Sequence, residues 1–512
     1  METEGGNREP GAKSSTWENP RRILFYLAVV AAFGYGALLI QNLGFGVGGS
    51  DSSGYANAAR LMLSGRAVAP IDALDLLGLP DRFGPQFTPL AFVPAPRPRT
   101  MAPFYPPGFP MHIALASLVA GWEAGPFVVS PIAAIFCLLL TYALARELGL
   151  SRLFSLAGAA ILGGCGVYLF QAVQAMSDVV ATCWSVAAVL FALRARRRRS
   201  WALAAGAAFG IAVLVRPTDL MLALPLAFAL PWNLASLSRF LAGGVPFGAF
   251  LLAWNRAAYG SALATGYSGL GGEFALAHFW PRFQHYGKWL IAQLSPLIPL
   301  GWLASVGDRK IPWRERTMLV VWFAAYFLFY CCWGPYNAWW YTRFLLPAIP
   351  ALIVGFLLVA RDLIHRLPER EAGGPRRHLR AATVLVLLLV IAGAEWRIAR
   401  RFRPLKTGRG QAVFREACRW LAEKGGERSA GKALVVSMEF SGAVRFYTDF
   451  PPLRWDVVNP EDFQAIQARA AERGYRIFGV VFPKELAPAR AHVPGNWTLV
   501  QTFGGATIWR LD

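Results

Sequence analysis

Four short polar segments, each beside an apolar stretch, carry side chains that could do chemistry. Asp51 lies in the segment from Gly49 to Tyr55, where its carboxylate could accept a proton from a hydroxyl group. Asp178, Arg216 and Arg343 lie at the ends of other apolar stretches. The planar guanidinium group of arginine is the preferred side chain for holding a phosphate. Together these residues offer a base for a hydroxyl and a cation for a phosphate.

The two aspartates also have a structural interpretation. Ser50 or Asp51 could cap a short helix from Tyr55 to Leu63. Asp178 could cap the helix that follows it and favour the positive end of its dipole. Capping and catalysis are compatible in one residue, so the sequence leaves both interpretations open for each aspartate.

The arginines and tyrosines lie where such side chains often meet a membrane surface. Arg216 could extend to lipid headgroups, and Tyr105, before Pro106 and Pro107, could belong to an aromatic belt. Residues 333–343 contain five aromatic side chains, Tyr341 among them, and end at Arg343. An aromatic belt explains the rings but not the arginine, because most basic residues concentrate on the other side of the predicted spans.

The composition indicates what holds these residues. The chain has 512 residues, of which 55% are hydrophobic and 16% charged, and its mean hydropathy is +0.39. Soluble domains carry about 25% charged residues, so a soluble protein is excluded. Apolar blocks of a length that can cross a bilayer predict an α-helical polytopic membrane protein with about eleven spans, at 23–41, 126–145, 153–172, 178–193, 201–215, 219–232, 239–258, 287–306, 317–333, 344–360 and 381–396.

The net charge of +21 is explained by topology rather than by a nucleic-acid partner. Six short stretches between spans hold 20 of the basic residues and six acids, with residues 194–199 the densest. They fall on one side if the tail of residues 1–22 is cytoplasmic, as the positive-inside rule requires. The basic flank 397–409 disagrees with this count, but we favour an outer position for the C-terminal region.

Three longer regions are predicted on the outer side: 42–125, 259–286 and 403–512. The first includes an apolar stretch at 108–121 that is short for a span and suits a re-entrant or interfacial helix. The membrane domain is predicted over 23–402, and residues 403–512 as a small extracytoplasmic α/β domain. Its order of strand 433–437, helix 460–473 and strand 477–482 favours a parallel strand pair, followed by a terminal hairpin.

The predicted sidedness limits the chemistry. No nucleotide pool exists outside a bacterial inner membrane, the location that the Ala-, Arg- and Gly-rich composition favours, so a sugar donor there must be carried by lipid. Glu273, His278 and His285 lie in one outer region without close ligand spacing. No metal site is therefore assigned, and a divalent metal remains open.

At these positions the chain resembles the GT-C superfamily of polytopic glycosyltransferases, in the protein-mannosyltransferase-like and aminoarabinose-transferase-like branch (glycosyltransferase family 39 and relatives). The resemblance is carried by short motifs in the same order: Asp51 with Tyr55, Tyr105-Pro106-Pro107, Ser177-Asp178, Arg216-Pro217, Tyr259-Gly260-Ser261 with Thr265-Gly266-Tyr267, and Tyr341 to Pro347 with Pro350. In the tail, residues 441–447 and 453–456 are similar to the outer tails of bacterial members.

The resemblance implies a GT-C fold, a polyprenyl-phosphate-linked sugar as donor, and a lipid, glycan or protein as acceptor. It implies that Asp51 is the catalytic aspartate of the first loop and Asp178 a second acidic residue at the site. The aminoarabinose transferases carry an acidic-basic pair where this chain has Phe104 and Tyr105, so Arg216 or Arg343 would hold the phosphate. Further candidate substrate- and donor-binding residues are Tyr55, Tyr105, Tyr341 and Lys288.

We therefore expect an inverting displacement, in which Asp51 deprotonates an acceptor hydroxyl that attacks the sugar while an arginine stabilises the leaving phosphate. The alternative from another class is a transporter or flippase of a lipid-linked saccharide, which would place charged residues inside the spans. Spans 126–145 and 317–333 contain no charged residue inside the bilayer core that would line such a path. A non-catalytic sensor with an outer α/β domain would not need the large first loop.

Overall fold

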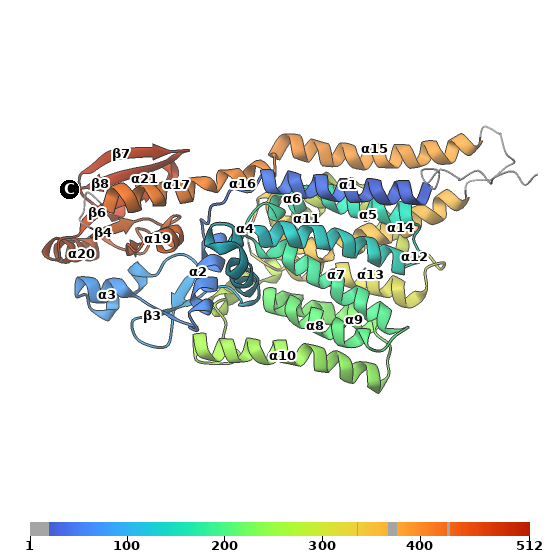
Figure 1. Ribbon diagram of the computed structural model, residues 1–512, viewed down its shortest axis with the longest axis horizontal. Helices are drawn as coiled ribbons and strands as arrows, with labels where there is room; N and C mark the ends of the chain where they lie inside the picture. Colours follow the sequence, from blue (N-terminus) through green and yellow to red (C-terminus); the bar gives the residue numbers. More distant parts are fainter. Residues whose placement is uncertain (1–19, 335, 367–375, 427–430) are drawn as a thin grey trace, which may run out of the picture.

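A computed structural model describes residues 20–334, 336–366, 376–426 and 431–512 of the chain. A bundle of long helices forms one part, and a small α/β domain lies at one end of it (Figure 1). The predicted fold class, an α-helical membrane protein with a small C-terminal sheet domain, is confirmed. Most of the predicted cytoplasmic tail, 1–19, and part of the basic stretch 361–380 lie outside the described residues.

Each of the eleven predicted spans lies on a helix or on a pair of adjoining helices. These elements are α1 Pro20–Gln41, α4 Gly108–Glu147, α5 Arg152–Gly164 with α6 Gly166–Ala172, α7 Ser177–Ala195, α8 Trp201–Val215, η3 Pro217–Leu222 with α9 Ala223–Ala229, α10 Leu234–Tyr259, α11 Phe279–Leu294 with α12 Leu297–Gly307, α13 Trp313–Cys331, η6 Trp339–Ala348 with α14 Ile349–Arg366, and α15 Arg376–Phe402. Among the described residues, five helices are long and apolar enough to cross a membrane, or seven if each of two bent pairs counts as one span. The number of eleven spans is thus not confirmed.

Two spans predicted as continuous helices are broken. The helix axis turns by 66° between α5 and α6, after Gly163 and Gly164, and by 107° between α11 and α12, where Ser295 has a φ of 63° and Pro296 follows. Glycine and proline weaken a helix at such points. The side chain of Gln293, beside the second break, accepts a hydrogen bond from Val167 N–H at 2.8 Å, just after the first. A side chain beside the second break therefore accepts a hydrogen bond from a backbone N–H group that the first break leaves without a helical partner.

The first long loop folds into short elements that precede α4. They are α2 Asp51–Leu63, β1 Ala69–Pro70, α3 Asp72–Leu77, η1 Asp81–Phe83, η2 Pro85–Phe87, β2 Phe92–Pro94 and β3 Thr100–Pro103. The three strands form an antiparallel sheet in the order β1-β3-β2. The stretch predicted as a separate helix at 108–121 is the first part of α4, which breaks at Gly121, where φ is 69°.

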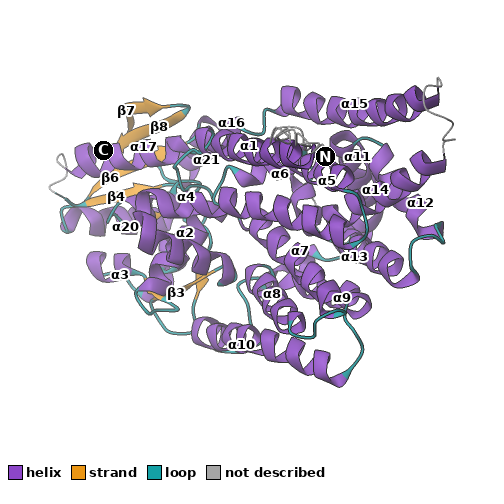
Figure 2. Ribbon diagram, turned by 45° about the vertical axis from the view of Figure 1, so that its right-hand side comes forward, coloured by secondary structure: helices purple, strands orange, loops and turns teal. Residues whose placement is uncertain are grey.

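The C-terminal domain follows α15 through α16 Lys406–Gly410, α17 Ala412–Trp420 and η7 Leu421–Gly425. Its remaining elements are β4 Ala433–Val436, α19 Ser441–Tyr447, β5 Pro452–Leu453, α20 Pro460–Glu472, β6 Arg476–Val481, α21 Pro483–His492, β7 Trp497–Phe503 and β8 Ala506–Leu511. The five-stranded sheet has the order β5-β4-β6-β8-β7, with helices packed against it (Figure 2). The predicted parallel pair is β4 and β6, and the predicted hairpin is β7 and β8.

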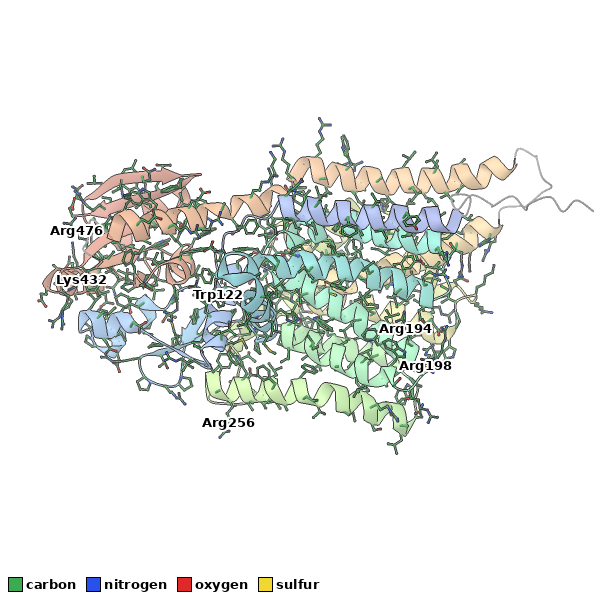
Figure 3. All side chains as sticks on the ribbon, viewed as in Figure 1. Trp122, Arg194, Arg198, Arg256, Lys432 and Arg476 are labelled. Carbon is green, nitrogen blue, oxygen red and sulfur yellow. The ribbon has the colours of Figure 1, made fainter. Side chains whose placement is uncertain are left out.

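The first loop and the C-terminal domain share one hydrophobic core. Leu74 and Phe83 of the loop pack in the same cluster as Leu434 and Phe463 of the domain. The helices α2 and α19 are also in close contact, because the side-chain amide of Asn57 donates to the carbonyl of Gly442 at 2.8 Å. Both regions lie at the end of the bundle opposite Arg194 and Arg198 of the basic segment (Figure 3). The large loop and the tail are thus packed into a single cap on the bundle.

Candidate active site

A cavity of about 1370 Å³ lies between the helical bundle and this cap. Seven of the eight predicted site residues line it: Asp51, Tyr55, Tyr105, Asp178, Arg216, Tyr341 and Arg343. They come from α2, the segment before α4, the first turn of α7, the end of α8, and η6. These residues are far apart in the sequence, and the fold brings them together around one cavity.

Lys288 is the exception and does not line this cavity. It lies within α11 rather than in an outer loop, because that helix begins at Phe279 and not near residue 287. Its ammonium group lies 5.4 Å from the centre of the Trp289 ring. The prediction that Lys288 contacts the donor therefore finds no support in the geometry.

Asp51 forms an ion pair with Arg343 at the first turn of α2. The carboxylate oxygen Oδ2 lies 2.7 Å from Arg343 Nη1, and Oδ1 accepts a hydrogen bond from the Tyr105 hydroxyl. That hydroxyl also lies 2.9 Å from Ser50 Oγ. Ser50 makes no side-chain capping bond to α2, so the structural role considered for Ser50 is not observed.

The environment of Asp51 favours its ionised form. Burial opposes the negative charge, but the guanidinium of Arg343 and the hydroxyl of Tyr105 outweigh burial and hold the pKa of Asp51 below its ordinary 3.8. Burial and the neighbouring carboxylate raise the pKa of Tyr105 well above its ordinary 10.0. The site at rest therefore holds an aspartate anion and a neutral tyrosine that donates to it.

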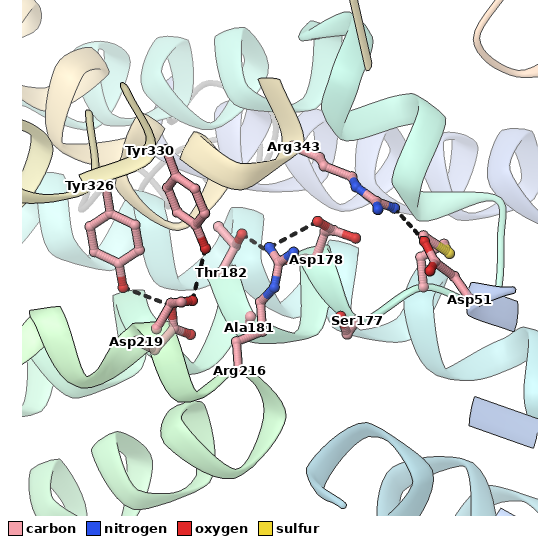
Figure 4. A network of polar contacts seen from close by, with 12 residues as sticks. Asp51, Ser177, Asp178, Ala181, Thr182, Arg216, Asp219, Tyr326, Tyr330 and Arg343 are labelled. Carbon is pink, nitrogen blue, oxygen red and sulfur yellow. Dashed lines mark hydrogen bonds and ion pairs between the residues drawn. The ribbon is translucent and has the colours of Figure 1, made fainter. Parts of the chain in front are cut away.

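Asp178 and Arg216 form a second ion pair at 2.9 Å (Figure 4). The Asp178 side chain is 1% exposed and that of Arg216 is 14% exposed, whereas Asp51 and Arg343 are 25% and 15% exposed. Neither Asp178 Oδ1 nor Arg216 Nη1 has an aligned hydrogen-bond partner, so the contact is one of charge. Asp178 lies in the first turn of α7, which begins at Ser177 after Met176.

A polar network supports this second pair from behind. The fully buried Asp219 accepts a hydrogen bond from the Tyr326 hydroxyl at 2.7 Å, and the Tyr330 hydroxyl donates to Thr218 Oγ1 at 2.9 Å (Figure 4). The segment from Arg216 to Asp219 is thereby fixed against α13. The ring of Phe344 lies under both cations, 5.6 Å from the Arg216 guanidinium and 5.3 Å from that of Arg343.

Sequence reasoning missed two parts of the cavity wall. The first is a set of aromatic side chains inside predicted spans, Phe170, Phe329 and Tyr330, which join aromatic residues of the segments already singled out, Phe104, Tyr267, Tyr336, Trp340 and Phe344. The second comes from the C-terminal domain, where Lys484 and Glu439 pair at 2.5 Å. Glu485 fixes both, because its carboxylate accepts from the backbone N–H groups of Phe482 and Glu439. The only sequence signal was Pro483, which is typical of a helix start.

Nothing in the described residues forms a metal centre of the usual kind. No group of three or more His, Cys, Asp or Glu side chains in that part of the chain is placed to hold a metal ion. The cavity instead presents two carboxylates, each held by an arginine, within a largely aromatic wall. Such an arrangement can bind an anionic group on the arginines and a polar, ring-shaped group against the aromatic side chains.

Comparison with known proteins gives one family match and several solved structures of similar fold. Residues 105–254 match the family described as dolichyl-phosphate-mannose-protein mannosyltransferase. No curated protein matches the chain significantly. Among solved structures, ArnT from Cupriavidus metallidurans bound to undecaprenyl phosphate is 15% identical, with a TM-score of 0.55, and the match covers 96% of this chain and 98% of that one.

Two further structures share the fold. The archaeal oligosaccharyltransferase AglB from Archaeoglobus fulgidus, in complex with an inhibitory peptide and a dolichol-phosphate, is 14% identical, with a TM-score of 0.53 and coverage of 96% of this chain and 75% of AglB. The arabinofuranosyltransferase AftD from Mycobacteria is 14% identical, with a TM-score of 0.54 and coverage of 96% and 42%. The resemblance to GT-C proteins of the protein-mannosyltransferase and aminoarabinose-transferase-like branch is confirmed. These matches support a membrane glycosyltransferase in general.

Proposed function

We propose that this protein is a membrane glycosyltransferase that moves a sugar from a polyprenyl-phosphate donor to an acceptor hydroxyl on the outer side of a bacterial inner membrane. The observation that carries the proposal is the Asp51–Arg343 ion pair in the wall of the cavity. It brings a carboxylate that can act as a base next to a guanidinium that can bind a phosphate. ArnT with undecaprenyl phosphate and AglB with dolichol-phosphate share the fold, which supports a polyprenyl-phosphate donor here.

The two aspartates have different roles in this proposal. Asp51 is partly exposed to the cavity, whereas Asp178 is almost fully buried against Arg216. A base must reach the proton that it removes, so Asp51 acts on the acceptor and Asp178 positions Arg216. The buried pair also keeps Arg216 charged and oriented without solvent, which strengthens its attraction for a phosphate.

Donor binding converts the resting ion pair into a working site. The donor phosphate competes with Asp51 for the guanidinium of Arg343, whose Nε is buried without a hydrogen-bond partner in the described structure. Once Arg343 holds the phosphate, Asp51 loses the contact that lowers its pKa and becomes a better base. The coupling keeps Asp51 weakly basic until a donor is present.

The transfer is then a single inverting displacement. Asp51 takes the proton of the acceptor hydroxyl, and the oxygen forms a bond to the anomeric carbon. The bond between that carbon and the phosphate oxygen breaks on the opposite face, so the electron pair leaves with the polyprenyl phosphate. The arginines stabilise the charge that develops on the leaving phosphate, and such a leaving group needs no separate acid.

The test is sugar transfer from a radiolabelled polyprenyl-phosphate sugar in membranes that contain the protein. The Asp51→Asn variant should lower transfer by about 100-fold or more, because general-base catalysis contributes 10²–10⁴-fold. The matched control is Asp75→Asn, which removes an exposed acid of the same loop that pairs only with Arg99. Normal transfer by Asp51→Asn at wild-type expression would refute the assignment, and absence of transfer by the wild type from every polyprenyl-phosphate sugar would refute the function.

A further inference from the structure

A second cavity, of about 590 Å³, lies between the first loop and the C-terminal domain. It shares no lining residue with the cavity that holds Asp51. Phe87, Phe92 and Met101 of the first loop give it an apolar wall, and α19 contributes Arg445. A pocket that combines an apolar wall with several convergent polar groups is typical of a binding site for a small molecule or a saccharide unit.

Arg445 is a half-buried cation on α19. In the described part of the chain no carboxylate pairs with its guanidinium within 4.0 Å, and the guanidinium lies 5.5 Å from the centre of the Phe92 ring. Burial lowers the pKa of Arg445 below its ordinary 12.5, and only the more distant Asp72 opposes this effect. Burying part of a charged group is costly unless an anion approaches it, and Arg445 lines the pocket, where an anion can reach it.

The neighbouring cation of the pocket is already engaged. The Arg60 guanidinium lies 3.8 Å from the centre of the Phe446 ring and 5.1 Å from that of Trp122, and it donates to the Phe446 carbonyl. Arg60 therefore joins α2 to α19, the same two helices that Asn57 and Gly442 connect. This leaves Arg445 as the cation of this pocket that can bind a ligand.

The remaining polar groups are acceptors suited to hydroxyl groups. Asp72 and Asp449 line the pocket, are exposed, and form no ion pair within the described residues. A purely inorganic anion would be repelled by them, whereas the hydroxyl groups of a sugar can donate to carboxylates while its acid group pairs with Arg445. The phenyl rings of Phe87 and Phe92 offer apolar surface to the carbon face of such a ring.

We propose that this outer pocket binds a saccharide that carries a carboxylate or a phosphate, with Arg445 holding the acid group. Both cavities border α2, which has Asp51 at its start and Arg60 nine residues later, about 13 Å along the helix axis. A glycan anchored in the outer pocket is thus held within the cap that covers the catalytic cavity. The inference goes beyond the transfer reaction and is tested by binding alone.

The experiment is isothermal titration calorimetry on the full chain in detergent micelles. Three probes are compared: an oligosaccharide containing glucuronic acid, glucose 1-phosphate, and the neutral oligosaccharide of the same length. Inorganic phosphate is titrated as a fourth probe. The wild type should bind one of the acidic saccharides at least tenfold more tightly than the neutral one, and the first two probes show whether the acid is a carboxylate or a phosphate.

The variant Arg445→Gln should weaken binding of the acidic saccharide about tenfold or more and leave binding of the neutral one unchanged. Arg445→Lys keeps the charge and should recover only part of the affinity, because a point charge replaces the planar fork. The control Arg97→Gln removes an exposed arginine of the first loop that does not line the pocket and should change nothing. Asp51→Asn should bind like the wild type, which separates this site from the catalytic one.

Four outcomes would overturn the proposal. The first three are equal affinity of the wild type and a folded Arg445→Gln protein for the acidic saccharide, equal affinity of the wild type for acidic and neutral saccharides, and no binding of any saccharide at millimolar concentration. If Arg445→Gln fails to fold, the proposal is tested by the affinity of Arg445→Lys for the acidic saccharide and by competition with inorganic phosphate. Inorganic phosphate that binds as tightly as the saccharides would also overturn it, because the carboxylates and rings would then contribute nothing.

Discussion

The two ion pairs of the cavity have the same chemistry and different surroundings. Asp178 is buried, with 1% of its side chain exposed, whereas the Asp51 side chain is 25% exposed, and the two arginines are alike, with 14% of Arg216 and 15% of Arg343 exposed. Asp178 is carried by a long helix of the bundle, and Asp51 by α2 of the cap. The difference indicates that one pair builds the site and that the other can exchange its partners.

The difference also explains why residue type alone does not assign a role. A buried pair that loses one partner leaves an uncompensated charge, which is strongly destabilising. In an ion pair at a cavity wall, a charged group of the substrate can take the place of the partner that carries the same sign of charge. The contact between Asp51 and Arg343 can thus be replaced by a contact between the donor phosphate and Arg343. The contact between Asp178 and Arg216 cannot be replaced in this way without leaving the buried Asp178 unpaired.

Beside Asp51→Asn, the largest effect on transfer is expected from Arg343→Gln. The variant removes the cation proposed to hold the leaving phosphate, so transfer should fall about 100- to 1000-fold, the range found when one group that stabilises developing charge is removed. Arg343→Lys should restore a part of the activity and bind the donor less tightly. Steady-state kinetics with the lipid-linked sugar measure both. Wild-type kcat/KM in a folded Arg343→Gln protein would contradict the proposed role of the exposed pair.

Asp178→Asn should mainly affect stability. The substitution leaves Arg216 buried without its carboxylate, and breaking one side of a buried pair costs about 3–5 kcal/mol. The double variant Asp178→Asn with Arg216→Gln should recover part of this loss, because no unpaired charge remains. Thermal unfolding in detergent, followed by tryptophan fluorescence, compares the three proteins. A double variant no more stable than the single one would show that the pair is not the unit that matters.

The pH dependence should distinguish the free enzyme from the donor complex. Arg343 and Tyr105 hold the Asp51 pKa below 3.8, so Asp51 stays ionised until the pH falls through that lowered value. The acidic limb of kcat/KM, which reports the free enzyme, should therefore lie below about pH 4. The limb of kcat should lie at higher pH, because the donor phosphate has taken Arg343. Coincident limbs would argue against the exchange of partners.

The same lowered pKa has a consequence for stability. Asp51 contributes stability at pH values above its unfolded-state pKa, and this contribution is lost as the pH falls through the lowered folded-state value. In Arg343→Gln the pKa of Asp51 should rise toward or above its unfolded-state value, so the loss of stability on acidification should be smaller than in the wild type. Unfolding temperatures measured between pH 7 and pH 3 for the two proteins test the direction of this shift.

The smallest effect is expected from Tyr105→Phe. The variant removes one hydrogen bond to Asp51 and leaves the ion pair with Arg343 in place. A hydrogen bond to a charged group contributes about 1.5–3 kcal/mol, and Ser50 can partly replace the donor because it lies close by. Transfer should fall about tenfold or less, with the larger part of the change in kcat. A loss as large as that of Asp51→Asn would give Tyr105 a direct role instead.

The parts of the fold that were predicted from sequence are those set by local patterns. Long apolar segments gave the helices of the bundle, and runs such as 433–436 and 476–481 gave the parallel strands of the tail. The breaks at Cys165 and Ser295 were missed because the hydropathy of an apolar segment does not show whether its helix is straight or bent. The short elements β5, α19 and α21 were missed because each is stabilised mainly by what packs on it, as Leu453 and Val444 are.

The candidate site divides in the same way. The motifs around Asp51, Asp178, Arg216 and Arg343 were recognisable because each is a polar segment at the end of an apolar one. Glu439 and Lys484 were not recognisable, because nothing in their local sequence indicates that the C-terminal domain covers the cavity. Lys288 stays a prediction: it was included because it lies at the edge of a predicted outer loop, and in the structure it lies on α11 and does not line the cavity.

By itself the sequence determined the class of molecule, since apolar blocks of sufficient length must be buried in a bilayer and their basic flanks must be sorted to one side. It also determined which charged groups were present to be paired. Only the tertiary structure decided the pairing, because Asp51 and Arg343 are brought to 2.7 Å from 292 positions apart by the packing of the cap on the bundle. Local sequence encodes a helix or a strand, and the burial and partner of a charge depend on everything that packs around it.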